Sequence, residues 1–462
     1  LTARFAKALF LDGISAFLFV ISPVLTKRAF YHSALSAHFL ILMAMAIWIY
    51  RDELKEKREF LCWVLLGVLA TTINAYYVPM VMGIMCMRLL QELLEKRSVK
   101  HLPAVFVFAA ASLFTGYLLG MFEGKVSFAA ANMENVSFNL LGFVNPKNEV
   151  LRHVLTMPLF SFDYEQSYSR FYDGFANLTP WQSEGFSYMG LGMLAAVLVA
   201  VILWLQKKRK QKASLSWSGW SLILSIGLGA LLFLFLALGP RAALGQQVLY
   251  DLQLGDGIYR LLSVFRTTGR LIWPVYYGLM TLALIGLAKL TRDLPGVKRR
   301  ILFVAILVFQ LLDISPSLTV KHEVYANVST SDAYENPLME TEVFAFLAGE
   351  AEEILFVSPT RAIALRPYWS TLFEDYALQN GMRMNAAYCS RDITQAADAY
   401  ADENIRMRKA GDRFPKILYI FPTEDMAEQY KDVGLHIYGY EDIYIGTDLD
   451  LVEYTDAKGR IG

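Results

Sequence analysis

Long uncharged apolar runs constrain this chain more than any other feature of its sequence. Five runs are long enough to cross a bilayer as helices, at residues 34–50, 102–122, 186–205, 220–238 and 271–288. Two shorter runs, at 14–25 and 301–312, can be extended by their flanking residues, so we expect them to span as well. Because 55% of the residues are hydrophobic, a purely soluble protein is not expected. The pattern predicts an α-helical polytopic membrane protein.

The run at 60–87 is also uncharged, but it contains Asn74 and Pro79. It is therefore either one kinked helix or two short helices that meet at Asn74. Basic short loops stay in the cytoplasm. The loops at 51–59, 88–101, 206–218 and 289–300 hold 18 Lys and Arg residues, against 10 in the segments 26–33, 123–185 and 239–270. Because both loops that flank 60–87 are then inside, this run crosses twice. Nine spans result, with the N-terminus inside.

The same topology divides the chain into two domains. Residues 1–314 form the transmembrane domain, with a large outer loop at 123–185 and a second outer loop at 239–270. Residues 315–462 are dense in charge and lack long apolar runs, so they form a separate extracytoplasmic domain. The expected location is the inner (plasma) membrane of a bacterium, with the C-terminal domain outside.

Short patterns predict an α/β fold for the C-terminal domain. The apolar runs at 354–357 and 417–421 are typical of buried strands, and 436–445 is an aromatic strand-like run. A helix is expected at 423–433, with Thr423 as its N-cap and Gly434 as its stop. The predicted core includes Leu355, Val357, Leu418 and Ile420.

Charge and motifs exclude several classes of function. Lys and Arg total 43, as do Asp and Glu, and this balance argues against a nucleic-acid partner. The three cysteines, Cys62, Cys86 and Cys389, form no metal or redox pair. No cofactor or metal site is indicated, and a divalent cation has no ligand set to support it. The pair Asp448 and Asp450 matches a DxD motif, but so short a pattern arises often by chance.

Basic residues at the outer ends of the spans are candidate ligands for a lipid phosphate. Arg266 and Arg270 stand four apart before an aromatic span, which would place both guanidinium groups on one helix face at headgroup depth. Arg28 and His32 have the same spacing on the first outer loop. The alternative is that these side chains only anchor the helices at the interface. His38, in the next span, is expected to be a packing residue.

Acidic residues give only one candidate for catalysis. Glu184 can act as a general base or bond a sugar hydroxyl, although an acid at a helix start also follows from the helix dipole alone. Asp313 lies late in the final span, and we expect it near the outer surface as an interface residue.

Three sets of residues carry a resemblance to a known family. They are Phe265-Arg-Thr-Thr-Gly-Arg270 before an aromatic span, Asn139-Leu140-Leu141 with Asn145-Pro146, and Gln182-x-Glu184-Gly185-Phe186-x-Tyr188-x-Gly190-Leu191-Gly192. Together they resemble a family of bacterial polytopic membrane proteins whose layout is similar to that of GT-C glycosyltransferases. Those enzymes take sugars from polyprenyl-phosphate carriers at the outer face of the membrane.

The resemblance implies a membrane glycosyltransferase that uses a lipid-phosphate-linked sugar and passes the sugar to a glycan or lipid acceptor. Asn139, Gln182 and Tyr188 join the basic residues as expected substrate-binding residues. In GT-C enzymes the catalytic carboxylate usually lies on the first large outer loop, but the loop at 26–33 has no acid. The resemblance therefore assigns no catalytic base.

Two further expectations stay open at this stage. The chain begins with Leu1, which we expect to reflect either a non-standard start codon or a missing N-terminal segment. The alternative to an enzyme is a non-enzymatic carrier of lipid-linked glycans, or an assembly partner for cell-envelope polymers. A carrier should have broken or charged helices around a midplane site, and the interruption at Asn74 to Pro79 is the feature that favours it.

Overall fold

The computed structural model describes residues 2–29, 33–122, 135–147, 167–210, 216–255, 257, 267–330, 336–365, 367–386, 394–451 and 458–461. These residues divide into two compact units. The first is helical and ends at Glu323, and the second contains a sheet and begins at Val324. Each unit has its own hydrophobic core.

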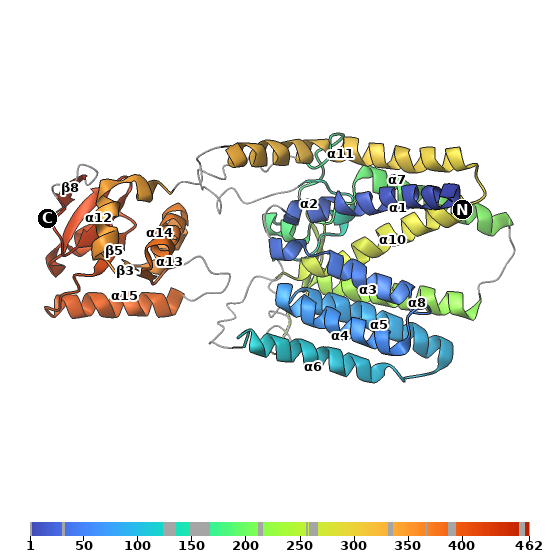
Figure 1. The fold of residues 1–462 in the computed structure, drawn as a ribbon, viewed down its shortest axis with the longest axis horizontal. Helices are drawn as coiled ribbons and strands as arrows, with labels where there is room; N and C mark the ends of the chain where they lie inside the picture. The colour runs from blue at the N-terminus through green and yellow to red at the C-terminus, as the bar shows by residue number, and fades with distance from the viewer. Residues whose placement is uncertain are drawn as a thin grey trace. The chain divides into compact units, whose positions relative to one another are not determined.

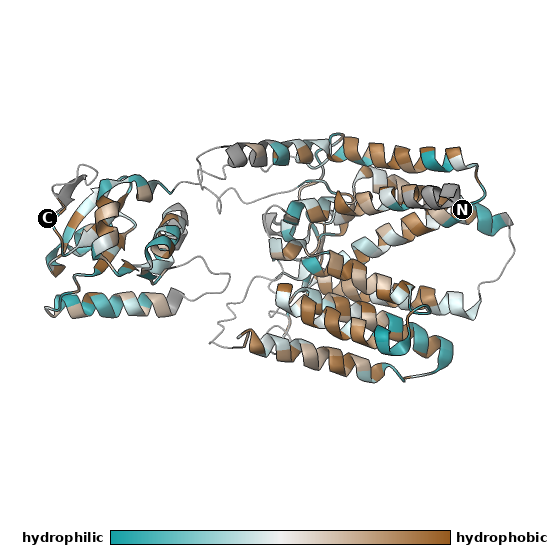
Figure 2. Ribbon diagram, viewed as in Figure 1, coloured by the Kyte–Doolittle hydropathy of each residue, from teal (hydrophilic) through white to brown (hydrophobic). Residues whose placement is uncertain are grey.

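The helical unit is a bundle in which most long helices run side by side (Figure 1). Its elements are α1 (Thr2–Val20), α2 (Pro23–Ala29), η1 (Ser33–Ser36), α3 (Phe39–Ile49), α4 (Glu56–Ile73), α5 (Tyr77–Lys96), α6 (Leu102–Leu118), η3 (Leu140–Phe143), η5 (Pro180–Gly185), α7 (Leu191–Lys210), α8 (Trp217–Leu238), β1 (Arg241–Leu244), β2 (Gln247–Asp251), η6 (Thr268–Ile272), α10 (Trp273–Leu290) and α11 (Gly296–Thr330). Figure 2 shows apolar residues along most of these helices and polar residues where α4 begins and α5 ends. Helices that are apolar on most sides are typical of a membrane environment.

Five helices in the described part of the chain are long and apolar enough to cross a bilayer: Tyr77–Lys96, Leu191–Arg209, Trp217–Leu238, Thr268–Leu290 and Gly296–His322. A sixth is counted if Phe10–Val20 and Pro23–Ala29, which bend by 56°, form one broken span. Two predicted spans correspond to the shorter apolar helices Ser33–Ile49 and Leu102–Leu118. At about 1.5 Å per residue, such helices fall short of a hydrocarbon core of about 30 Å. The length and apolar character of these helices identify a multi-pass membrane protein. The count of nine spans stays a prediction.

The predicted interruption within residues 60–87 is confirmed, since α4 and α5 are separate helices. Asn74 lies between them in an extended conformation, and its Oδ1 accepts a hydrogen bond from the backbone N–H of Tyr76 at 3.1 Å. Such a side-chain bond to the backbone two residues on is typical of a turn. The break therefore places Tyr76 at the start of α5.

The predicted outer loops contain order that the sequence did not indicate. In the segment 239–270, β1 and β2 form an antiparallel hairpin. Gly245 at its turn has φ +60°, a conformation that glycine adopts readily. Asn139, from the other predicted loop, forms an isolated bridge with Ala243 of β1. The described parts of the two loops therefore fold against each other.

The second unit is built on a mixed six-stranded sheet with strand order β4-β3-β5-β7-β6-β8. β3 is parallel to β4 and β5, whereas β5–β7, β7–β6 and β6–β8 are antiparallel. The elements are η7 (Pro337–Glu340), α12 (Glu342–Glu350), β3 (Glu353–Phe356), α13 (Pro359–Leu365), α14 (Pro367–Asn380), β4 (Arg383–Met384), α15 (Thr394–Lys409), β5 (Ile417–Phe421), α16 (Glu424–Gln429), η8 (Lys431–Val433), β6 (His436–Tyr440), β7 (Ile443–Thr447) and β8 (Lys458–Ile461).

Alternate residues of the central strands fill two separate cores, one on each face of the sheet. Leu418 and Ile420 pack in one core with residues of α12 and α14, while Leu355 and Val357 lie in the other core with residues of α15 and α16. All four are buried, as predicted. Because the sheet is covered on both faces, every residue of β3 and β5 is buried.

Two boundaries differ from the expectations. The predicted domain boundary at 314–315 falls inside α11, which continues to Thr330 with Pro316 in its interior. The helix remains part of the helical unit as far as Glu323, where Ser317 is buried and Lys321 bonds Tyr168. In the second unit, α16 is shorter than predicted and has no side-chain hydrogen bond from Thr423 as a cap.

Candidate functional site

Four side chains from three distant parts of the chain meet at one carboxylate, and we call them the Glu184 cluster: Lys27, Arg28, Glu184 and Arg270. Arg28 Nη2 donates to Glu184 Oε2 and to the Glu184 carbonyl oxygen, both at 2.9 Å. Arg270 donates to the same Oε2 through Nε at 3.1 Å and Nη2 at 2.6 Å. Lys27 Nζ donates to the carbonyl oxygen of Ser183 at 2.5 Å. One carboxylate oxygen therefore holds two guanidinium groups together.

Two glycines explain how Glu184 and Arg270 meet. A Cβ added to Gly269 would lie 2.9 Å from the Cα of Gly185, so a side chain at this contact would force the two segments apart. Glu184 and Arg270 are the chain neighbours of these glycines. The backbone N–H of Gly269 also donates to the carbonyl oxygen of Val136 at 3.2 Å. The close backbone contact thus sets the distance between the acid and the base.

Basic groups outnumber the acid in this cluster. The Arg28 side chain is 2% exposed, that of Arg270 12% and that of Glu184 24%. Burial opposes ionisation of Glu184, but the charges of Arg28, Arg270 and Lys27 prevail and lower the pKa of its carboxyl far below its ordinary value. Glu184 is therefore ionised at neutral pH, and the two guanidinium groups alone exceed its charge.

Aromatic rings flank both arginines. The Arg270 guanidinium carbon lies 4.8 Å from the centre of the Tyr76 ring, and that of Arg28 lies 5.8 Å from the Trp273 ring, within the range of cation–π contacts. Tyr76 Oη also accepts a hydrogen bond from the Thr267 N–H at 2.9 Å. The break between α4 and α5 therefore supplies one wall of the cluster.

Asn139 and Gln182, both predicted to bind substrate, are bonded to each other. Asn139 Nδ2 donates to Gln182 Oε1 at 3.0 Å and to the Gly245 carbonyl oxygen at 2.8 Å, and its Oδ1 accepts from the Gly245 N–H at 2.9 Å. Gln182 Nε2 lies 3.3 Å from Ser137 Oγ. Their amide groups hold the hairpin turn against the segment that carries Glu184.

Tyr188, also predicted to bind substrate, is completely buried and donates from Oη to Asp313 Oδ2 at 2.7 Å. Asp313 accepts two more hydrogen bonds, from Ser169 Oγ at 2.5 Å and from the backbone N–H of Leu191 at 2.8 Å. We expected Asp313 near the outer surface, but it is fully buried. These hydrogen bonds compensate the cost of burying the carboxylate. They also attach the loop residue Ser169 and the first turn of α7 to α11.

Two predicted site residues, His32 and Arg266, lie outside the described residues, so their pairing with Arg28 and Arg270 stays a prediction. His38 is buried, with Nδ1 2.6 Å from Tyr277 Oη and its ring centre 4.4 Å from that of Trp273. This is the packing role that we expected for it.

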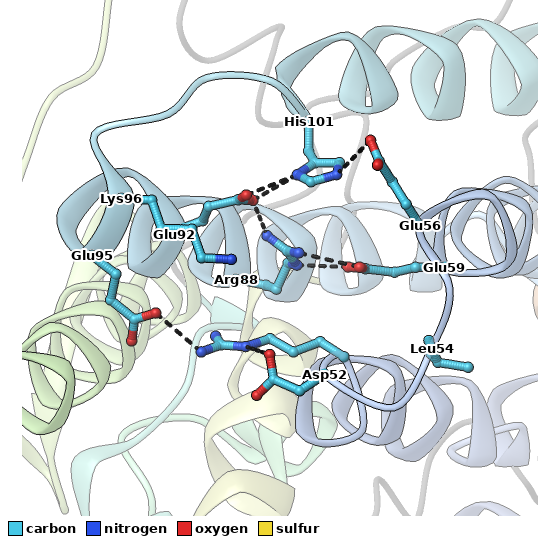
Figure 3. Close-up of a pocket in the computed structure, with 10 residues that line it drawn as sticks. Asp52, Leu54, Glu56, Glu59, Arg88, Glu92, Glu95, Lys96 and His101 are labelled. Atoms are coloured by element: carbon cyan, nitrogen blue, oxygen red, sulfur yellow. Dashed lines mark hydrogen bonds and ion pairs between the residues drawn. The ribbon is translucent and has the colours of Figure 1, made fainter.

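A second group of charges surrounds a pocket of about 150 Å3 where α4 begins and α5 ends (Figure 3). We call it the Arg88 pocket, and its lining residues are Arg51, Asp52, Leu54, Glu56, Glu59, Arg88, Glu92, Glu95, Lys96 and His101.

Arg88 lies between two carboxylates at the centre of this pocket. It donates to Glu59 Oε1 at 2.6 Å and to Glu59 Oε2 at 3.1 Å, and it also pairs with Glu92. His101 Nδ1 lies 2.8 Å from Glu92 Oε2, and its Nε2 lies 3.2 Å from Glu56 Oε1. In the sequence, these residues stood out only as charged residues in or beside the basic loops. Nothing in the sequence indicated that they form ion pairs with one another.

The structure gives the DxD pair a place in the fold. Asp448 forms an ion pair with the buried Arg408, with Nη1 3.0 Å from Oδ2. Asp450 accepts a hydrogen bond from Tyr438 Oη at 3.0 Å. Within the described residues, no group of three or more His, Cys, Asp or Glu side chains is arranged to hold a metal ion.

Comparison with protein families gives two matches. A family described as "Domain of unknown function (DUF6311)" matches residues 1–315, and one described as "DUF6311 C-terminal domain" matches residues 344–447. No curated protein and no solved structure matches the chain. The first match thus covers nearly all of the helical unit, including every residue of the Glu184 cluster.

Proposed function

The chain belongs to the DUF6311 family, and we propose that it is a membrane glycosyltransferase that takes a sugar from a lipid-phosphate carrier. The carrier's phosphate binds at the Glu184 cluster. The acceptor is a glycan or a lipid, and the setting is the inner membrane of a bacterium with the C-terminal domain outside. The sequence resemblance to GT-C enzymes supports the reaction class, and the cluster supports the type of donor.

The surplus of buried basic groups carries the proposal. A buried guanidinium is costly unless it is paired, yet Arg28 and Arg270 share a single carboxylate oxygen. A phosphate would compensate the remaining charge, and arginine suits phosphate because its planar fork offers two parallel donors. In sugar transfer the leaving lipid phosphate gains negative charge, so the same arginines would stabilise the transition state.

Glu184 has a different role in this proposal from that of a general base. A carboxylate whose pKa is lowered by two arginines remains ionised and is a weak proton acceptor. Its contacts support a role in orienting both guanidinium groups. The general base of the reaction is left unassigned.

A carrier of lipid-linked glycans is the second candidate, and one observation favours it. The helix pair Phe10–Val20 and Pro23–Ala29 bends by 56°, and Lys27 and Arg28 lie in the last turn of its second helix. Broken helices that end at a binding site are common in transporters. Purified protein in vesicles distinguishes the two functions, because an enzyme releases the carrier lipid without its sugar, whereas a carrier moves the intact lipid-linked sugar across the bilayer.

The Arg270→Lys variant tests phosphate binding at the cluster. Lysine keeps the charge but lacks the two-donor fork, so affinity for a polyprenyl-phosphate analogue should fall about tenfold to a hundredfold, or roughly 1.5 to 3 kcal/mol. Binding is measured on purified full-length protein, and thermal unfolding checks that both proteins are folded.

Arg241→Lys is the matched control, because Arg241 pairs with Asp251 at 2.6 Å and not with Glu184. It should bind the analogue as the wild type does. Equal affinity of folded Arg270→Lys and wild type would remove Arg270 from the site and leave it as an interface anchor.

The orientation has its own test. Single cysteines at Lys208 and Thr330 in a cysteine-free background should react differently with an impermeant thiol reagent, with Thr330 labelled from outside and Lys208 protected. The opposite result would invert the topology.

A further inference from the structure

A pair of lysines lies beside the Glu184 cluster and is linked through two aromatic rings. Lys27 Nζ, from α2, lies 4.8 Å from the centre of the Phe186 ring. Lys321 Nζ, from α11, lies 4.8 Å from the Tyr168 ring and 3.2 Å from its Oη. The two ring centres are 4.7 Å apart. Each ammonium group therefore contacts one ring of the same aromatic pair.

In the part of the chain that the structure describes, the lysines do not form the ion pair with a carboxylate that the arginines form. Glu184 pairs with Arg28 and Arg270, and neither lysine has a described carboxylate within ion-pair distance. Among the described residues, the ammonium groups bond neutral oxygen atoms: Lys27 bonds the Ser183 carbonyl oxygen and Lys321 bonds Tyr168 Oη. An anion that reaches both ammonium groups would add the negative charge that these neutral oxygens do not supply.

The lysine pair is adjacent to the arginine pair and not a separate patch. Lys27 and Arg28 are consecutive, and they bind the consecutive residues Ser183 and Glu184. A ligand held by both pairs would thus present two anionic groups side by side. Arginine forks suit one phosphate, while lysine ammonium groups act as point charges for a second.

We propose that Lys27 and Lys321 form a second phosphate subsite and that the lipid bound here is a diphosphate. This inference rests on the proposed function, because it places the first phosphate at Arg28 and Arg270. It adds that the protein distinguishes a lipid diphosphate from a lipid monophosphate.

Binding of three probes to detergent-purified full-length protein tests the subsite: farnesyl diphosphate, farnesyl monophosphate and inorganic pyrophosphate. Wild type should bind farnesyl diphosphate roughly tenfold or more tighter than the monophosphate. Lys321→Met should remove most of that difference while changing monophosphate affinity by less than about twofold. Lys321→Arg keeps the charge and should retain the preference.

Lys298→Met is the matched control, since Lys298 is an exposed lysine at the other end of α11. It should bind all three probes as the wild type does, and thermal unfolding confirms that each variant is folded. Equal binding of the two lipids by wild type would overturn the second subsite, as would equal loss of both lipids in Lys321→Met. Pyrophosphate binding as tight as that of farnesyl diphosphate would overturn the lipid assignment in favour of a water-soluble diphosphate.

The result can be separated from that for the proposed function. Monophosphate binding that depends on Arg270, together with no preference for the diphosphate, refutes only the second subsite. No binding of either lipid to the wild type refutes the proposed function itself.

Discussion

The Glu184 cluster and the Arg88 pocket use the same side-chain types in opposite proportions. In the Arg88 pocket, one buried guanidinium lies between the carboxylates of Glu59 and Glu92. In the Glu184 cluster, one carboxylate lies between two guanidinium groups. Glu92 also lies 2.8 Å from His101 Nδ1, so the second carboxylate of the Arg88 pocket has a basic partner of its own. In the Glu184 cluster the second guanidinium shares the one carboxylate, and this surplus of positive charge leaves binding capacity for an anion. The Arg88 pocket is thus expected to stabilise the fold, whereas the Glu184 cluster is suited to bind a ligand.

The largest effect is expected from removing the centre of the Arg88 pocket. Arg88→Met would leave Glu59 and Glu92 buried without their cation, and this should lower the free energy of unfolding by about 3 to 5 kcal/mol. Denaturant unfolding of the detergent-solubilised protein measures the change. Arg58→Met, at an exposed position on α4, is the control and should be neutral. A loss below about 1 kcal/mol would mean that water compensates the two carboxylates.

A smaller loss is expected in the Glu184 cluster. Glu184→Gln would leave Arg28 and Arg270 without their shared anion, but Glu184 is 24% exposed, so we expect a loss of roughly 2 to 3 kcal/mol, below the range for fully buried pairs. Adding a phosphate ligand should restore part of this stability, because the ligand replaces the missing charge. If the variant were as stable as the wild type, the carboxylate would not organise the arginines.

The pH dependence of stability gives an independent check on Glu184, which precedes the span that begins at Leu191. The pKa of its carboxyl is lowered in the folded protein because the effect of Arg28 and Arg270 exceeds that of burial. Its contribution to stability is therefore complete above the unfolded pKa of about 4.3 and is lost as the pH falls toward the lower folded pKa. The difference in stability between wild type and Glu184→Gln should be constant from neutral pH to about pH 5 and shrink below about pH 4. A difference that shrinks near neutral pH would contradict the lowered pKa.

The smallest effect is expected at the rim of the Arg88 pocket. Lys100 pairs with Glu56 at 2.9 Å, but both side chains are more than half exposed. Water and salt screen such a pair, so Lys100→Met should leave the unfolding midpoint unchanged within error. A clear decrease would show that the network extends to its exposed members.

Features set by local pattern were predictable from the sequence. Asn74 and Pro79 indicated the break between α4 and α5, and two apolar runs indicated β3 and β5, because turn chemistry and full burial leave signals within a few residues.

Contacts between distant segments left no such signal. Glu184 is 156 positions from Arg28 and 86 from Arg270, so each residue could be proposed separately but not as one cluster. The burial of Asp313 could not be predicted for the same reason, since it depends on a loop that returns to α11. Asn139 and Gln182 were each expected to bind substrate, but the sequence did not show that they bond to each other.

The contact between α7 and α11 limits how this family can vary. A Cβ at Gly192 would lie 2.5 Å from the Ile306 carbonyl oxygen, and one at Gly190, where φ is +83°, would overlap the Gln310 side chain. Gln310 in turn bonds the backbone at Met189 and Met193. The atom that Gly192 faces at 306 belongs to the backbone, so no side-chain substitution at 306 would make room for a larger residue at 192. We therefore expect homologues that keep this helix contact to retain glycine at both 190 and 192.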